Sequence, residues 1–165
     1  MPFTSLSRRE LLRATWAIPV TWKFTDSPTL RDLFGRYTHC LAVRDPTSLA
    51  GLFAEDAKYR DLTFGVKLVG RDAIRNMFAR TFSAVTASRY RVEHAAFDGD
   101  TIAVRWEMSG VHEGPMLGMP PSGRRIGFRG ASFLTIRAGQ VAEQIDYLDR
   151  AGLERELGVR GARRD

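Results

Sequence analysis

The order of its hydrophobic patterns is the feature that most constrains how this chain can fold. Helical spacing dominates the first half, and everything after Ala87 has the pattern of β-strands joined by turns. Asp98-Gly99-Asp100 and Ala138-Gly139 are hairpin signals. The strands are predicted at about 90–97, 101–111, 125–137 and 140–148. Helices followed by a long meander predict an α+β domain.

Three helices are predicted before the meander. Asp26-Ser27-Pro28 is a helix start, because a capping side chain precedes a proline of the first turn, and an apolar stripe that includes Tyr37 follows at helical spacing. A second short helix starts at Asp45-Pro46, and a third runs from Gly70 to about Phe82. Two short strands are expected at 57–69, and a short C-terminal helix ends at Leu157-Gly158.

These elements predict a cone-shaped, curved antiparallel sheet with three helices over its concave face, plus an N-terminal extension. Such a cone has one blind pocket, so its inward polar groups are candidates for chemistry. The chain of 165 residues fits one domain, and its hydrophobic (44 %) and charged (27 %) fractions are ordinary for a globular protein. We expect a domain at 27–158 between an extension, 1–26, and a basic tail, 159–165.

Composition excludes several function classes. The net charge is +6, but the arginines are dispersed and form no basic stripe with interleaved aromatic residues, so nucleic-acid binding is not predicted. Cys40 is the only cysteine and the three histidines lack metal-site spacing, so no metal site is predicted. No apolar run approaches the roughly 20 residues that span a bilayer.

The N-terminal extension has an export-like feature. SRRELLR, residues 7–13, resembles a twin-arginine signal. The apolar stretch behind it is brief, contains Pro19, and is followed by no small-x-small cleavage site. We therefore expect a helix that lies on the domain and a cytoplasmic protein, with export as the alternative.

Two parts of the sequence carry a family resemblance. RYTHCLAVRDPTSLAGLFAEDAKYRD (36–61) and GRDAIRNMF (70–78) resemble the superfamily of ketosteroid isomerases, nuclear transport factor two and SnoaL-like polyketide cyclases. GVHEGPMLGMPPSGRRIGFRG (110–130) and the segment 139–158 are similar to the SnoaL-like branch. The resemblance implies the cone fold and a homodimer formed through the outer face of the sheet. It does not imply one reaction, because this fold hosts many.

The isomerase pattern of this superfamily matches two residues. Tyr37 takes the place of an oxyanion-binding tyrosine and Asp61 that of a base. The second oxyanion donor of the isomerases falls near Ala131, whose methyl group donates no hydrogen bond, which argues against steroid isomerase activity.

The SnoaL-like pattern uses an aspartate of the final strand as general acid/base in an aldol ring closure without metal or cofactor. Asp146 is the candidate and Asp149 the fallback. The first hypothesis is thus a cofactor-independent cyclase or isomerase-type enzyme that acts on a hydrophobic, carbonyl-bearing small molecule. Asp61 would be a second acid or base, and the hydrogen-bond donors to the oxyanion would be Tyr37, Tyr59 and His112.

Two alternatives stay open. A limonene-type epoxide hydrolase would use Asp146 as base, hold a water with Tyr59 and Asp61, and orient the carboxylates with Arg105. A non-catalytic small-molecule-binding or interaction domain would use the same cone without acid/base chemistry.

The orientation of the strand 101–111 distinguishes the cyclase hypothesis from the epoxide-hydrolase alternative. Trp106 and Met108 share one face with His112, whereas Arg105 and Glu107 share the other, and only one face of a regular strand points into a pocket. A bulge near Gly110 would bring both sets partly inward. The predicted substrate-binding residues are Tyr37, Phe64, Trp106, Glu107 and Met108.

Overall fold

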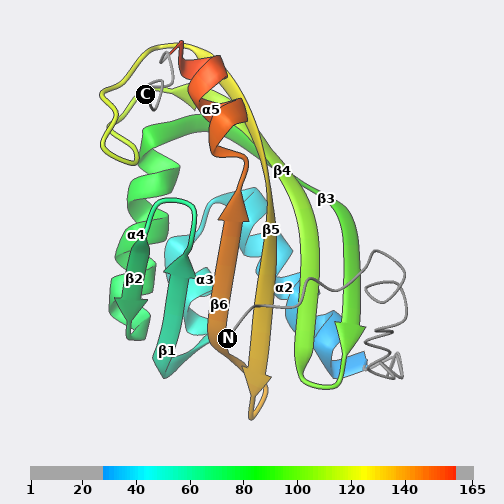
Figure 1. Ribbon diagram of the computed structural model, residues 1–165. Coiled ribbons are helices and arrows are strands. Elements are labelled where there is room, and N and C mark those ends of the chain that lie inside the picture. The colour runs from blue at the N-terminus through cyan, green and yellow to red at the C-terminus, as the bar shows by residue number, and fades with distance from the viewer. Residues whose placement is uncertain (1–27, 159–165) are drawn as a thin grey trace, which may run out of the picture.

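The computed structural model describes residues 28–158, which form a curved six-stranded sheet with helices packed against one face (Figure 1). The strands are β1 (Phe53–Asp61), β2 (Val66–Val69), β3 (Val85–Asp98), β4 (Thr101–His112), β5 (Arg125–Arg137) and β6 (Gln140–Leu148). The helices are α2 (Pro28–Val43), α3 (Pro46–Gly51), α4 (Arg71–Ala84) and α5 (Arg150–Leu157). The α+β fold is therefore confirmed, while the expectations for 1–26 and 159–165 lie outside the described residues.

The sheet is mixed, whereas an antiparallel one was predicted. Its strand order is β2-β1-β6-β5-β4-β3, and β1 runs parallel to β6. The other four junctions are antiparallel. A turn signal in the sequence predicts only the pairing of two strands that follow each other in the chain, and β1 and β6 are far apart in sequence. The parallel junction therefore has no local signal.

Local chemistry explains where the helices begin and end. Asp45 caps α3 by accepting hydrogen bonds from the backbone N–H groups of Thr47 and Ser48, both at 3.0 Å. Asp149 caps α5 through the N–H group of Gly152 at 2.8 Å. Gly158 ends α5 with a φ of 72°, a left-handed conformation that favours glycine.

The sheet curves around the helices because the ladder between β3 and β4 is irregular. The pairing of β3 with β4 shifts register between Thr86 and Arg89 and again between Val92 and His94. Such bulges bend a strand and increase its twist. Strand β3 also starts five residues earlier than the predicted Tyr90, since Val85 leaves α4 directly in an extended conformation.

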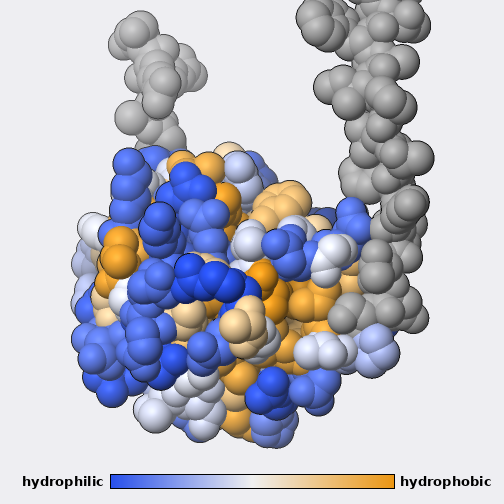
Figure 2. All heavy atoms as spheres, turned by 90° about the horizontal axis from the view of Figure 1, so that it is seen from below, coloured by the Kyte–Doolittle hydropathy of each residue, from blue (hydrophilic) through white to orange (hydrophobic). Residues whose placement is uncertain are grey.

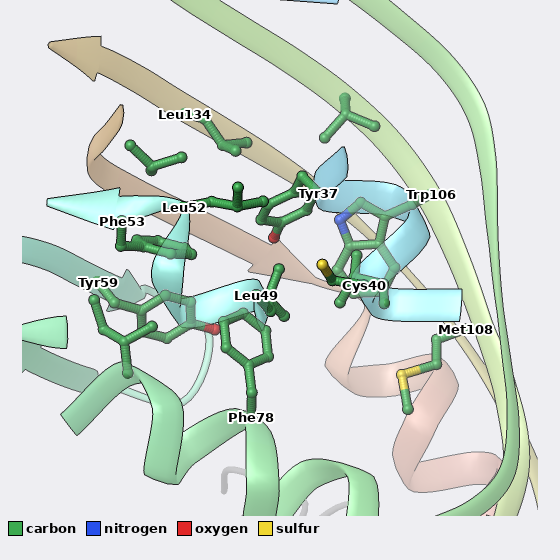
Figure 3. Packing of buried hydrophobic residues seen from close by; sticks show 14 of the residues in the cluster. Tyr37, Cys40, Leu49, Leu52, Phe53, Tyr59, Phe78, Trp106, Met108 and Leu134 are labelled. Atoms are coloured by element: carbon green, nitrogen blue, oxygen red, sulfur yellow. The ribbon is translucent and has the colours of Figure 1, made fainter. Parts of the chain in front are cut away.

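The hydrophobic core fills the space between the sheet and helices α2, α3 and α4. Along β4, buried residues alternate with more exposed ones up to His112, so no bulge turns this strand at Gly110. Figure 3 shows side chains of sheet and helices converging on this space, among them Tyr37, Tyr59, Phe78, Trp106 and Met108. No helix in the described part of the chain is long and apolar enough to cross a membrane.

Candidate functional site

A pocket of about 130 Å³ opens into the core between the sheet and α4. Its walls are mostly aromatic and aliphatic, and a few polar side chains gather on β1, β5 and β6. The lining residues are Tyr37, Leu41, Tyr59, Asp61, Val66, Met77, Phe78, Thr81, Phe82, Tyr90, Trp106, Met108, Met116, Leu117, Phe128, Ser132, Gln144, Asp146 and Leu148.

Asp146 is the centre of the polar group. Its side chain is buried, with 6 % of its surface exposed. Tyr59 donates its hydroxyl proton to Oδ2 at 2.7 Å, and the amide Nε2 of Gln144 donates to Oδ1 at 2.9 Å. Ser132 is the partner of Asp146 across the β5–β6 ladder, and its hydroxyl also hydrogen-bonds the carboxylate. Every one of these donors is neutral.

A second set of hydrogen bonds orients those donors. Tyr37 donates to Oε1 of Gln144 at 3.0 Å, which leaves the NH₂ group of that amide facing Asp146. Trp106 donates its indole N–H to the hydroxyl of Ser132 at 2.8 Å, so that the proton of Ser132 is free to point at Asp146. The alternation of β6 places Gln144 and Asp146 on the same inward face.

Burial raises the pKa of Asp146 above its ordinary value, because the ionised carboxylate has lost most of its hydration. The hydrogen bonds from Ser132, Gln144 and Tyr59 act in the opposite direction, while the neighbouring carboxylate of Asp61 adds to the rise. Burial prevails over the hydrogen bonds. A carboxyl group with a raised pKa is a stronger base when ionised, as acid/base chemistry requires.

Asp61 lies beside Asp146 on the neighbouring strand, since the two residues are register partners in the β1–β6 ladder. It is 4 % exposed. Its Oδ1 accepts the backbone N–H groups of Thr63 at 2.8 Å and of Phe64 at 3.0 Å, which shapes the turn after β1. Burial raises the pKa of Asp61, and these two hydrogen bonds oppose the rise.

The two tyrosines predicted from the sequence line the pocket, but each hydroxyl group already donates its proton to an acceptor within the protein. Tyr37 gives its proton to Gln144 and Tyr59 gives its proton to Asp146. Burial raises the pKa of both phenols, so both remain protonated donors. They therefore support the carboxylate and are not free to hold a substrate oxyanion.

The structure does not bring Arg105 and Glu107 to the pocket. Both point to the opposite face of the sheet, where the Arg105 side chain is 67 % exposed and pairs with Glu93 at 2.9 Å. Glu107 forms ion pairs with Arg91 and Arg129, and its hydrogen bond to Arg91 lowers its pKa. The Arg105 side chain that the epoxide-hydrolase alternative needs beside the carboxylates is thus not among the described residues that line the pocket, because β4 keeps its regular alternation.

His112 and Phe64 lie outside the set of residues that line the pocket. His112 is fully buried at the end of β4, where Nδ1 lies 3.1 Å from the hydroxyl of Ser122 and Nε2 has no partner among the described residues. Phe64 is partly buried, and its ring lies 5.5 Å from the guanidinium carbon of Arg150. Trp106 and Met108, in contrast, line the pocket as predicted.

Sequence reasoning missed four polar residues of the pocket wall: Thr81, Tyr90, Ser132 and Gln144. Gln144 and Ser132 lie on the inward faces of their strands, together with core residues. A polar residue at a position where the strand alternation predicts an apolar one is the signal that could have identified them. Asp149, the fallback for Asp146, is an exposed helix cap. Among the described residues, no group of three or more histidine, cysteine, aspartate and glutamate side chains is arranged to hold a metal ion.

A family model described as SnoaL-like polyketide cyclase matches residues 31–157. Among solved structures, TsrD from Streptomyces laurentii is similar at 27 % identity, over 82 % of this chain and 99 % of that one, with a TM-score of 0.72. A SnoaL-like protein from Jannaschia sp. CCS1 has the same fold at 19 % identity, over 82 % and 98 % of the two chains, with a TM-score of 0.73. No curated protein sequence matches at a significant level.

Proposed function

Because the chain belongs to the SnoaL-like polyketide cyclase family, we propose that it is a cofactor-independent enzyme that transfers a proton at a carbon atom of a hydrophobic, carbonyl-bearing small molecule. The observation that carries the proposal is a buried Asp146 whose hydrogen-bond donors are all neutral, in the wall of an apolar pocket. Nothing in this arrangement neutralises the carboxylate, so it retains the basicity that the reaction needs.

The hydrogen bonds of Asp146 leave room for the substrate. An ionised carboxylate has about four lone-pair positions. Tyr59, Gln144 and Ser132 occupy three of them. The remaining position is the one from which Asp146 would remove a proton, and the three donors hold the group in a single orientation.

The reaction balances without a further reactant. Asp146 takes a proton from the carbon next to a carbonyl group, the C–H electron pair moves into the enolate, and the carbonyl oxygen gains the negative charge. In a ring closure, the enolate carbon then attacks a second carbonyl group of the same molecule. The resulting alkoxide takes the proton back from Asp146, so the product is an isomer of the substrate.

The pocket walls support a hydrophobic substrate. Most lining side chains are aromatic or aliphatic, and none of the described lining residues is basic. With Asp61 and Asp146 both in the wall, a negatively charged group would be repelled from the interior. We infer that the part of the substrate inside the pocket is uncharged, and that Asp61 serves as a second acid or base beside Asp146.

The epoxide-hydrolase alternative receives little support. Its pattern needs Arg105 beside the catalytic carboxylates, but this side chain lies on the outer face of the sheet. Tyr59, which would hold the attacking water, instead donates to Asp146.

Hydrogen exchange into a simple ketone tests the proposal without knowledge of the substrate. The probe is β-tetralone, a ketone with one aromatic ring, incubated with the protein in deuterium oxide and followed by proton NMR. We expect deuterium to enter next to the carbonyl faster than in buffer. Asp146→Asn should slow this exchange by about 100-fold or more, the usual contribution of a general base.

The matched control is Asp149→Asn, which changes an exposed aspartate three residues further along the chain and should leave the exchange rate unchanged. If β-tetralone binds but exchanges no faster than in buffer, or if Asp146→Asn exchanges as fast as the wild type, the protein is not an acid/base enzyme of this kind. The binding-domain alternative would then be favoured.

A further inference from the structure

We propose that Tyr90 of β3 donates the hydrogen bond that holds the carbonyl oxygen of the substrate, and that the group it holds is a flat, uncharged ketone. This inference rests on the proposed function of the pocket and adds to it the residue that binds the developing oxyanion. Tyr90 was not among the residues selected from the sequence.

The other hydroxyl and indole donors of the pocket already have acceptors within the protein. Among the hydroxyl and indole groups that line the pocket, Tyr37, Tyr59 and Trp106 donate to protein acceptors. Ser132 points its proton at Asp146, and the Thr81 hydroxyl donates to the backbone oxygen of Met77 at 3.1 Å. Each of these protons would have to leave a partner before it could reach a substrate.

The amide of Gln144 does not fill this role. It is 2 % exposed, and its Nε2 already donates to Asp146. Tyr90 is only partly buried, and its hydroxyl has no hydrogen-bond partner among the described residues. The other donors of the pocket wall already have protein acceptors, so the Tyr90 hydroxyl is the donor that is available to a ligand.

Tyr90 and Asp146 lie on separate strands of the sheet. Tyr90 pairs with Met108 across the β3–β4 ladder, whereas Asp146 lies on β6, three places away in the strand order. The two groups therefore approach the concave space from different sides, as a base and an oxyanion donor must do to act on neighbouring atoms of one substrate. Burial raises the pKa of Tyr90, with further contributions from Tyr37 and Asp146, so the phenol keeps its proton at neutral pH.

Tyr90 belongs to a cluster of aromatic rings. The Tyr90 ring lies 5.4 Å from the Trp106 ring, tilted by 34°, and the Phe128 ring packs edge-on against the Trp106 ring at 6.0 Å. Gly130 makes room for the indole, since a Cβ atom there would lie 2.5 Å from Cζ2 of Trp106. Such a set of ring faces and edges favours flat, apolar ligands.

The size of the pocket limits what enters. Its volume of about 130 Å³ is close to that of an engineered cavity of about 150 Å³ that holds one benzene molecule. One ring with its carbonyl group therefore fits inside. A larger molecule, including β-tetralone with its second fused ring, would extend toward Leu117, which lines the pocket and is 37 % exposed.

Infrared spectroscopy of bound β-tetralone with a carbon-13 carbonyl tests the proposal. We expect the carbonyl stretch in the wild-type protein to lie below its frequency in an apolar solvent, because a hydrogen bond weakens the C=O bond. Tyr90→Phe should restore the apolar-solvent frequency and slow deuterium exchange by about 100-fold or more, the usual cost of one oxyanion donor.

Two tyrosine variants are the controls. Tyr147→Phe changes a residue on the outer face of the sheet and should leave both frequency and rate unaltered. Tyr37→Phe removes a buried hydroxyl from the Asp146 network and should leave the carbonyl frequency shifted. A protonated Asp61 is the competing donor, so loss of the shift in Asp61→Asn together with its retention in Tyr90→Phe would overturn the proposal.

A measurement on the wild-type protein guards against a variant that fails to fold. With carbon-13 at the ζ position of tyrosine, the four tyrosines of the chain give separate signals. The Tyr90 signal should shift most when β-tetralone binds. An unmoved Tyr90 signal, an unshifted carbonyl stretch, or no binding of β-tetralone would each contradict the proposal.

The two proposals fail in different ways. If Asp146→Asn abolishes exchange while the carbonyl shift survives in Tyr90→Phe, the acid/base function stands and the role of Tyr90 is wrong. If the shift depends on Tyr90 but exchange does not depend on Asp146, Tyr90 binds the ketone and the proposed base is wrong.

Discussion

At the scale of single residues, the directions of the hydrogen bonds fix the arrangement of the polar side chains in the pocket. Asp146 accepts from three neutral donors, and two of them are themselves oriented by Tyr37 and Trp106. Fully connected buried networks of this kind hold their members in one arrangement, since a broken link leaves a buried polar group without a partner. The orientation of the carboxylate is therefore a property of the network.

The raised pKa of Asp146 makes stability depend on pH. Below the unfolded-state pKa of about 4, the group is neutral in both states and costs nothing. As the pH rises toward the folded-state pKa, the unfolded state releases its proton first, so wild-type stability falls. Asp146→Asn escapes this loss, and its unfolding free energy relative to wild type should rise as the pH increases above about 4, by about 1.4 kcal/mol for each pKa unit of upward shift.

Urea unfolding at several pH values measures this difference. Asp56→Asn is the control, because Asp56 lies on the surface and its hydrogen bond to Arg137 lowers its pKa. That variant should lose stability relative to wild type as the pH rises, the opposite sign. A difference between Asp146→Asn and wild type that stays flat over the same pH range would contradict the expected pKa shift.

The inward positions of Asp61 and Asp146 were accessible from the sequence, whereas the uses of the tyrosines were not. Strand alternation and the family resemblance together select the two aspartates, which lie side by side in the structure. The partner of a tyrosine hydroxyl depends on a residue more than eighty positions away, as in the pairs Tyr59–Asp146 and Tyr37–Gln144. No local pattern contains that information.

At the scale of elements, turns and caps account for most of what was predicted. The expected strands 125–137 and 140–148 agree with β5 and β6, because Ala138-Gly139 marks the turn between them. The parallel pairing of β1 with β6 has no such marker, and it is this pairing that brings Asp61 next to Asp146. The sequence thus predicts where the strands of the site lie in the chain better than it predicts which strands pair with each other.

Asp149 illustrates how the elements separate structural from chemical roles. Its side chain caps α5 at the end of β6, so Asp149→Ala should lower the unfolding free energy by about 1 kcal/mol, the usual value of a helix cap. Thermal or urea unfolding measures the loss. Asp149→Asn keeps a capping oxygen and should retain most of the stability, and the deuterium exchange rate should be unchanged in both. A large loss of exchange in Asp149→Ala at full folding would assign chemistry to Asp149 instead.

At the scale of the whole molecule, the two faces of the sheet have different characters. The helices cover the concave face, while no described helix covers the outer face (Figure 1). Seen from below, hydrophilic residues cover much of the surface and hydrophobic ones show in a band between them (Figure 2). On the outer face, Phe133 and Tyr147 are 44 % and 46 % exposed and contact each other edge-on at 6.1 Å.

Five charged side chains of this outer face pair with one another, and their net charge is +1 (three Arg, two Glu) although the chain carries +6. Arginines there are paired with glutamates in a network of ion pairs that flanks the two aromatic rings. The network consists of Arg91, Glu93, Arg105, Glu107 and Arg129. An apolar centre with a balanced polar rim suits a contact between two identical faces, because each copy supplies both signs of charge.

We therefore expect a homodimer through the outer face, as the family resemblance implies. Sedimentation velocity at micromolar concentration should find a dimer for the wild-type protein and a monomer for Phe133→Ser combined with Tyr147→Ser, which removes the exposed aromatic centre. The control is Val69→Ser, which removes an apolar side chain that is 69 % exposed at the edge strand β2 and should leave the dimer intact. Because Asp146 and Tyr90 lie on the other face, the double variant should still bind β-tetralone. A wild-type monomer, or equal dissociation by Val69→Ser, would show that this face does not pair two copies.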